Sequence, residues 1–321
     1  IKLITMKSAF IFCISLLALS FWTSCADEHV TLNGNLYNSL SEVYAELAPP
    51  VQTFTINADI GGTVTGLKGT SIEFPADAFI DQQGAIVSGN VTVTIIEVLT
   101  ESEMIGSGIY PINTNGDLLS SGGEIYINVS QDGERLTMTP GAYYILQVPA
   151  FNDQSMGVYE GIGATADSFW NYVSPTLDSL PFGGTYRDTA IYSLLEDVYT
   201  VISDILGWVN CDAFPDVQFI NCNVHYTGVD DLDAGLTSVI FIADYYMLSA
   251  YPSPFVYDTP SNTSTECYLP VTSGYILTTT IKAGVLYFGI TTDITPIEGA
   301  TYEITLTAGT PDDLAALLDA L

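Results

Sequence analysis

The side chains that most often carry enzymatic chemistry near neutral pH are scarce in this chain. Its two histidines are His29 and His225. His29 lies in a polar stretch, whereas His225 alternates with apolar residues, which predicts a strand residue that points to solvent. The sequence contains no Gly-x-Ser-x-Gly, His-Glu-x-x-His or phosphate-loop motif. We therefore expect no catalytic residue and no enzymatic activity.

Among the charged and metal-ligating side chains, only the carboxylates are abundant: the chain has 37 Asp and Glu residues, but 6 Lys and Arg, 2 His and 5 Cys. A pair of carboxylates could hydrolyse a glycosidic bond at a defined separation, which a sequence does not reveal. The clearest acidic turn is Asp230, Asp231 and Asp233, ahead of Gly235. It predicts a calcium site, because Ca²⁺ prefers carboxylate and carbonyl oxygens, although the distal Glu and the following helix of an EF-hand are missing. A plain acidic turn is the alternative, and we expect no other cofactor.

Three of the five cysteines, Cys211, Cys222 and Cys267, lie in the second half of the chain. The segment from Cys211 to Cys222 reads as two short strands around a Pro-Asp turn. Such a hairpin would place these two cysteines opposite each other, so it predicts a disulfide between them. Three buried thiols are the alternative. Zinc ligation with His225 fits no compact ligand spacing.

The charge of the chain excludes nucleic acid as a partner. All 37 acidic residues but only four basic ones follow Cys25, which gives 4 − 37 = −33 for that part. A phosphate backbone would be repelled, because its binding depends on Lys and Arg displacing counterions. The same charge suits a well-solvated surface.

The residues from Met6 to Cys25 resemble the signal peptide of a bacterial lipoprotein. Lys7 precedes an apolar run from Ala9 to Trp22, and small residues stand just before Cys25. We expect translation to start at Met6, residues 1–24 to be removed, and Cys25 to be lipidated, so that lipid holds the chain on a membrane. The acidic residues just after Cys25 resemble the signal for display on the outer membrane of Bacteroidota. We therefore expect an outer-membrane lipoprotein that is exposed at the surface rather than periplasmic.

The rest of the sequence predicts an all-β fold of two β-sandwich domains in tandem with a short C-terminal helix. Residues 25–50 should form the lipidated tether and a short helix capped by Ser39 and stopped at Pro49. Apolar residues then recur with period two, which predicts a sandwich over 51–150 and a second β-rich domain over 151–321. Within the latter, spacing favours a helix over 188–204, and the cap at Thr310 predicts the terminal helix.

The runs Gly61-Gly62-Thr63-Val64 and Gly69 to Phe79 resemble the opening of the ZU domain of zonula occludens proteins and netrin receptors. That family uses a β-sandwich to bind other proteins and has no catalytic role. The order of modules resembles lipoproteins of Bacteroidota in which a ZU-like module precedes a second β-domain. The resemblance implies a binding or scaffold module at the cell envelope, with an unknown protein or polysaccharide partner. A carbohydrate-capturing or carbohydrate-active surface lipoprotein is the alternative.

Overall fold

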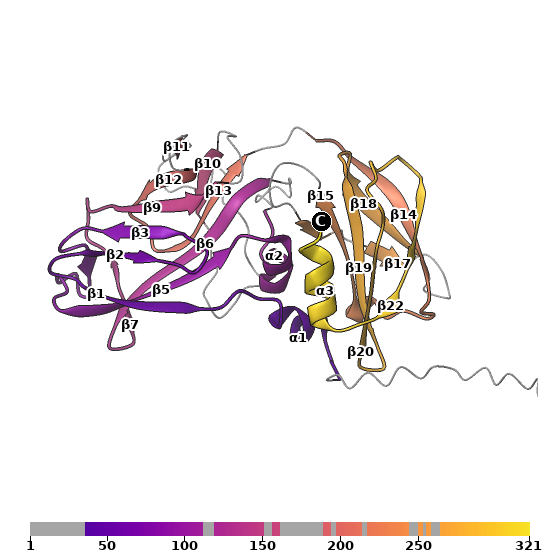
Figure 1. Cartoon of the computed structure of the whole chain (residues 1–321), viewed down its shortest axis with the longest axis horizontal. Coiled ribbons are helices and arrows are strands. Elements are labelled where there is room, and N and C mark those ends of the chain that lie inside the picture. Colours follow the sequence, from indigo (N-terminus) through magenta and orange to yellow (C-terminus); the bar gives the residue numbers. More distant parts are fainter. Residues whose placement is uncertain are drawn as a thin grey trace, which may run out of the picture. The chain divides into compact units, whose positions relative to one another are not determined.

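The computed structural model describes residues 36–111, 119–150, 156–160, 189–193, 197–213, 217–243, 250–252, 255–257 and 264–321. They belong to one compact unit, Asn35–Leu321. It is an all-β structure with a few short helices (Figure 1). The expected signal peptide, Cys25 and His29 lie outside the described residues.

Ten strands follow one another in the largest sheet, in the order β1-β5-β6-β13-β10-β11-β12-β9-β3-β2, and β7 adds to β6. Their bounds are β1 Gln52–Asn57, β2 Gly62–Thr65, β3 Ser71–Phe74, β5 Asn90–Val98, β6 Ser120–Gln131, β7 Glu134–Arg135, β9 Tyr144–Pro149, β10 Met156–Glu160, β11 Thr189–Ser193, β12 Val198–Ser203 and β13 Gly207–Ala213. Asn57 and Gly61 form an isolated bridge next to the two end strands β1 and β2. The sheet therefore curls around a shared interior.

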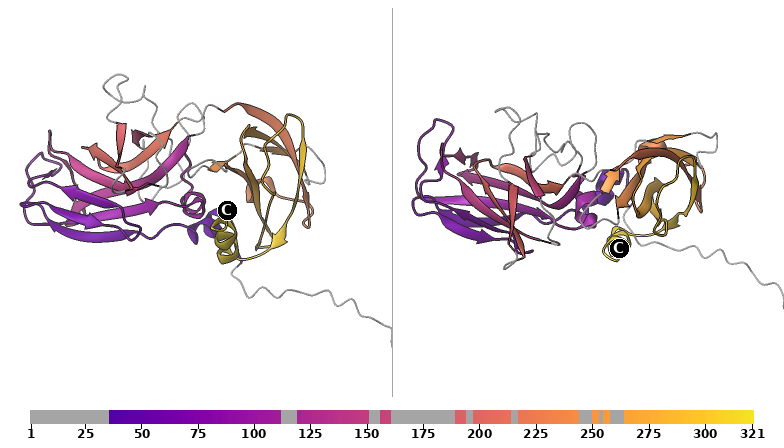
Figure 2. Two further views of the ribbon diagram at one scale, coloured as in Figure 1. Left: turned by 45° about the horizontal axis from the view of Figure 1, so that its top comes forward. Right: turned by 90° about the horizontal axis from the view of Figure 1, so that it is seen from above.

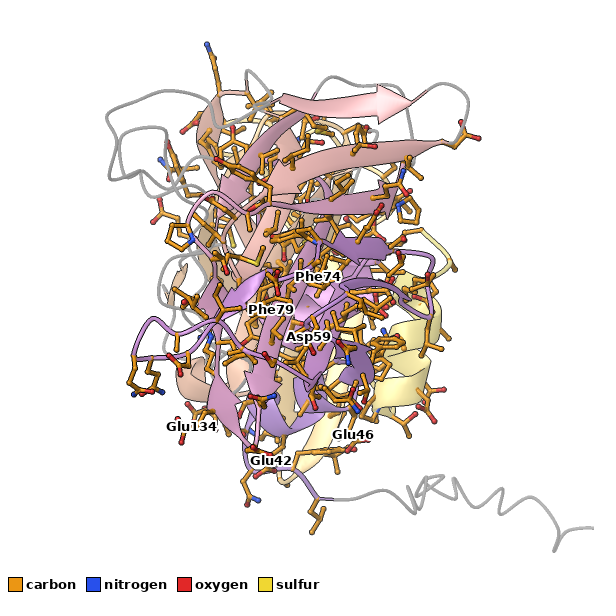
Figure 3. All side chains as sticks on the ribbon, turned by 90° about the vertical axis from the view of Figure 1, so that its left-hand side faces the viewer. Glu42, Glu46, Asp59, Phe74, Phe79 and Glu134 are labelled. Atoms are coloured by element: carbon orange, nitrogen blue, oxygen red, sulfur yellow. The ribbon has the colours of Figure 1, made fainter. Side chains whose placement is uncertain are left out.

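That interior is the first core cluster, to which strands from both ends of the sheet contribute. Val91, Val93 and Ile95 enter it from alternate positions of β5. Phe74 and Phe79 belong to it, with ring centroids 5.2 Å apart. Figure 3 shows these two side chains together, with Glu42, Glu46 and Glu134 nearer the lower edge of the view. The small sheet of β4 Phe79–Ile80 and β8 Thr137–Met138 completes this part of the chain.

The strands after residue 155 correct two expectations. β12 pairs with β9, and β13 pairs with β6, so the boundary expected at residue 150 falls inside the first sheet. The helix expected over 188–204 is wrong, because β11 and β12 occupy most of that segment. Tyr199, Thr200 and Val201 favour strands, and pairing along β9 outweighs the helical spacing of Leu194, Val198, Val201 and Ile202.

Two further sheets face each other in the C-terminal part of the chain (Figures 1 and 2). One has the order β17-β18-β14-β21 and the other β16-β15-β19-β20-β22. Their bounds are β14 Phe219–Thr227, β15 Thr237–Ala243, β16 Ala250–Pro252, β17 Phe255–Tyr257, β18 Ser264–Pro270, β19 Gly274–Lys282, β20 Val285–Ile290, β21 Thr301–Thr305 and β22 Thr307–Ala308, with the 3₁₀ turn η3 Ala234–Leu236 before β15. Val224 and Leu269 from one sheet and Phe241 and Ile276 from the other share one core cluster. This is the packing of a β-sandwich.

Three helices meet in a remaining core cluster: α1 Leu40–Ala45, α2 Glu101–Ser107 and α3 Pro311–Leu318. Ser39 caps α1, and Thr310 and Asp313 form a capping box on α3, which confirms both predicted helix starts. Tyr44 on α1 shares a hydrogen bond of 2.6 Å with Thr279 of β19. The helices thus bury their apolar sides against both groups of strands.

Candidate functional site

The least expected feature of the described residues is a buried acidic cluster on the neighbouring strands β6 and β13. It consists of Ser121, Glu124, Asn210 and Asp212, all of which are 0% exposed. The Asn210 amide nitrogen Nδ2 donates to Glu124 Oε1 at 3.2 Å and to Asp212 Oδ2 at 2.9 Å. Ser121 Oγ donates to Asn210 Oδ1 at 2.7 Å. One carboxamide therefore joins two carboxyl groups inside the protein.

A β-bulge brings these four side chains to one face of the sheet. Asn210 pairs with Glu124 and Asp212 with Ser121, so two steps along β13 match three steps along β6. The extra residue is accommodated at Gly123, which has φ 122°, and whose N–H donates to Ser121 Oγ at 3.1 Å. A Cβ on Gly123 would lie 2.4 Å from Leu99 Cδ2. Glycine is therefore required for both the backbone angle and the space.

Burial decides the protonation of this acidic cluster. Desolvation, followed by the nearby charge of Asp212, raises the pKa of Glu124 well above its ordinary value. Within the described part of the chain, Glu124 Oε2 has no hydrogen-bond partner. The arrangement therefore favours the protonated form of Glu124. Because the cluster is 0% exposed, it offers its carboxyl groups to no solvent-borne substrate.

The acidic cluster was not predicted from the sequence. Glu124 stands within the strand Gly-Glu-Ile-Tyr-Ile-Asn-Val, and Asn210 and Asp212 alternate with Val209 and Cys211. That alternation is also typical of a strand with one face in water. The residues around Glu124, Asn210 and Asp212 therefore carried no local signal of burial on both faces.

A second buried carboxylate has a structural task. Glu97 accepts hydrogen bonds from Lys68 N, Thr70 N and Gln52 Nε2, at 3.0, 3.0 and 2.8 Å. It thereby satisfies the backbone of the turn between β2 and β3. A Cβ on Gly66 in that turn would lie 2.4 Å from Glu97 Oε2.

The predicted hairpin between Cys211 and Cys222 is wrong. Cys211 lies on β13 in the first core cluster, whereas Cys222 lies on β14 in the core of the sandwich. β13 pairs with β6 and β10, and β14 pairs with β18 and β21, so the two strands lie in different sheets and do not pair with each other. Directly opposite Cys222 stands Cys267.

The turn that is predicted to bind calcium contacts the ammonium group of Lys282. Lys282 Nζ donates to the backbone oxygens of Asp230 and Asp231, at 2.9 and 2.7 Å. The carboxylate of Asp233 accepts from Gly235 N at 2.8 Å and caps η3. Over the described ranges, no group of three or more His, Cys, Asp or Glu side chains could hold a metal ion. Calcium at Asp230, Asp231 and Asp233 stays a prediction.

The side of the β17-β18-β14-β21 sheet that faces away from its core carries exposed and half-buried polar side chains around His225. We call it the outer face; it comprises Asn221, Asn223 and His225 of β14 with Ser264, Glu266 and Tyr268 of β18. Phe219 of β14 stands at its end, where it is partly buried and also packs against the core cluster. The side chains of His225 and Ser264 are 3.1 Å apart and share a hydrogen bond. The rings of Phe219 and Tyr268 stack with centroids 5.2 Å apart and planes at 20°. This face could contact a ligand.

The expected lipidation site Cys25 lies outside the described residues, as does His29. Among the residues that are described, the helices are all too short or too polar to cross a bilayer. Comparisons with protein-family models, curated proteins and solved structures find no match to this chain.

Proposed function

We propose that this chain is a non-enzymatic, lipid-anchored protein of the cell envelope that acts as a binding or scaffold module. The observation that carries the proposal is the run from Lys7 to Cys25, in which a basic residue, an apolar stretch and small residues precede a cysteine. The resemblance of residues 61–79 to the ZU domain agrees with a binding role. In this proposal the protein is displayed on the outer membrane, and its partner is a protein or a polysaccharide.

The surroundings of the ionisable groups support a role without catalysis. Glu124 and Asp212 are buried, Glu97 holds a turn, and Asp233 and Asp313 cap helical turns. A catalytic acid or base must reach the proton that it transfers. These five carboxyl groups are either buried or engaged in hydrogen bonds within the fold.

The test of the anchor is metabolic labelling with a radioactive fatty acid in cells that produce the full chain. The wild type and the Cys13→Ala control should both take up label, whereas Cys25→Ala should not. Label on Cys25→Ala, or an unlabelled wild type, would contradict the proposal. Protease added to intact cells should then digest the protein while a periplasmic marker survives, because display places the chain outside.

A second candidate function, capture of a carbohydrate, is favoured by the outer face. Tyr268 is 43% exposed and stacks on Phe219, and Asn221 and Glu266 offer hydrogen-bonding groups beside the pair. Aromatic rings bury the apolar faces of ligands while neighbouring polar groups fix their orientation. The same aromatic pair could equally contact a protein.

Affinity electrophoresis through gels that contain soluble polysaccharides distinguishes these partners. If the outer face captures sugar, at least one polysaccharide should retard the wild type and should fail to retard Tyr268→Ala. Tyr143→Ala is the matched control, because Tyr143 is a 51% exposed tyrosine of the first half of the chain. Equal retardation of Tyr268→Ala and Tyr143→Ala, or retardation by no polysaccharide, would contradict sugar capture by this face.

A further inference from the structure

Cys222 and Cys267 occupy directly opposite positions on two neighbouring antiparallel strands. The register of β14 and β18 pairs Cys222 with Cys267, Ile220 with Leu269 and Val224 with Thr265. Side chains of directly opposite residues lie on the same face, with Cβ atoms about 4.5–5.5 Å apart. A disulfide joins Cβ atoms about 3.5–4.5 Å apart. A small adjustment of the pair therefore brings the two sulfur atoms into bonding range.

Both cysteines point into the same interior. Each is 1% exposed, and both belong to the core cluster of the sandwich. In the structure both are free thiols: Cys222 Sγ lies 3.9 Å from the backbone oxygen of Cys267 on the neighbouring strand, and Cys267 Sγ lies 3.9 Å from the backbone oxygen of Thr265 on its own strand. Cys211 belongs to the other core cluster, on a strand that pairs with neither β14 nor β18. The fold thus selects one pair among these three cysteines.

We propose that Cys222 and Cys267 form a cross-strand disulfide. The oxidant is a disulfide donor, either the disulfide of a thiol oxidoreductase or a small-molecule disulfide. The thiolate of one cysteine attacks the donor and releases one donor thiol; the thiolate of the other then attacks the mixed disulfide and releases the second. Two cysteine protons are lost, and the donor gains two electrons. Because the folded sandwich buries both sulfur atoms, the bond forms before β14 and β18 finish packing.

The disulfide would stabilise the strands that carry the outer face. Asn221 and Asn223 flank Cys222, and Glu266 and Tyr268 flank Cys267. Since successive side chains of a strand point to opposite faces, these four residues face outward while the sulfur atoms lie directly beneath them. A covalent bond at this position fixes the spacing of the outer-face residues. The proposal does not depend on which partner that face binds.

The test traps the thiols in cells that produce the full chain. Acid precipitation stops thiol exchange, and the protein is then alkylated in denaturant without reductant and digested with pepsin. Trypsin is unsuitable, because no Lys or Arg lies between Arg187 and Lys282 and all three cysteines stay in one peptide. We expect a peptide pair joined through Cys222 and Cys267, lost after reduction, together with an alkylated peptide that contains Cys211.

Two variants make this result specific. Cys211→Ala should keep the joined peptide pair, and Cys267→Ala should leave Cys222 fully alkylated. The measurement reads covalent state in denaturant, so it remains valid if a variant folds poorly. Full alkylation of both Cys222 and Cys267 in the wild type without reductant would overturn the proposal, as would a peptide that joins either of them to another cysteine.

Discussion

Replacing Glu124 by Gln should remove one pH-dependent contribution to the stability of this protein. Burial, with the charge of Asp212 as the second cause, raises the pKa of Glu124 in the folded chain, whereas in the unfolded chain the group ionises at its ordinary pKa. Between these two pKa values the folded chain holds one more proton than the unfolded chain. Stability is therefore greatest below the ordinary pKa and is lost as pH rises toward the folded pKa.

The magnitude follows from the one proton involved. One proton that is bound in the folded state and released in the unfolded state lowers the free energy of unfolding by about 1.4 kcal/mol for each unit that the pH rises. Gln is neutral at every pH and resembles the protonated acid in size. Its carboxamide can still contact the amide of Asn210, which lies 3.2 Å from Glu124 Oε1. The variant should therefore become more stable than the wild type as pH rises.

Urea unfolding followed by tyrosine and tryptophan fluorescence, from about pH 5 to about pH 8, measures this difference. The free energy of unfolding of Glu124→Gln minus that of the wild type should rise by up to about 1.4 kcal/mol per pH unit. Glu73→Gln is the control: Glu73 is an exposed carboxylate on β3 of the same sheet, and the difference should stay flat. A flat difference for Glu124→Gln as well would refute the reasoning that burial keeps this group protonated.

Three further results are expected. Gly66→Ala should destabilise the protein by about 1–3 kcal/mol in urea unfolding, because its Cβ would meet the carboxylate of Glu97 at 2.4 Å; an unchanged midpoint would contradict the contact. If the acidic turn binds calcium, Ca²⁺ should raise Tm of the wild type but not of the Asp231→Asn, Asp233→Asn double variant, and equal shifts would exclude this site. Reductant should lower the free energy of unfolding of the wild type by about 4 kcal/mol, since the proposed disulfide joins residues 45 positions apart. The free energy of unfolding of Cys222→Ala should not change with reductant. A wild type that is equally stable with and without reductant would contradict the proposed bond.

Local signals in the sequence predicted much of the fold. The period-two runs at β5, β6, β9 and β19 are strands, and the caps at Ser39 and Thr310 begin helices, because both features depend on neighbouring residues alone. The all-β class is confirmed. The helix α2 was missed: its N-cap Thr100 and C-cap Gly108 were present, but it spans only Glu101–Ser107, too few residues for a clear helical period.

The pairing of distant strands could not be predicted in the same way. β13 joins β6, and Cys222 faces Cys267, through contacts between segments far apart in the chain. The acidic cluster depends on that pairing and on the bulge at Gly123, since a register without the extra residue would turn Ser121 and Glu124 to opposite faces. No local pattern around Glu124 specifies its partner strand.

The mass of the N-terminal peptide shows whether Cys25 carries a lipid anchor. The full chain is extracted from cell membranes with detergent and digested with trypsin, and the first peptide should end at Lys68. We predict that this peptide begins at Cys25 and carries the added mass of a diacylglyceryl group on the cysteine. A peptide that begins upstream of Cys25, or one that begins at Cys25 without lipid, would contradict the account.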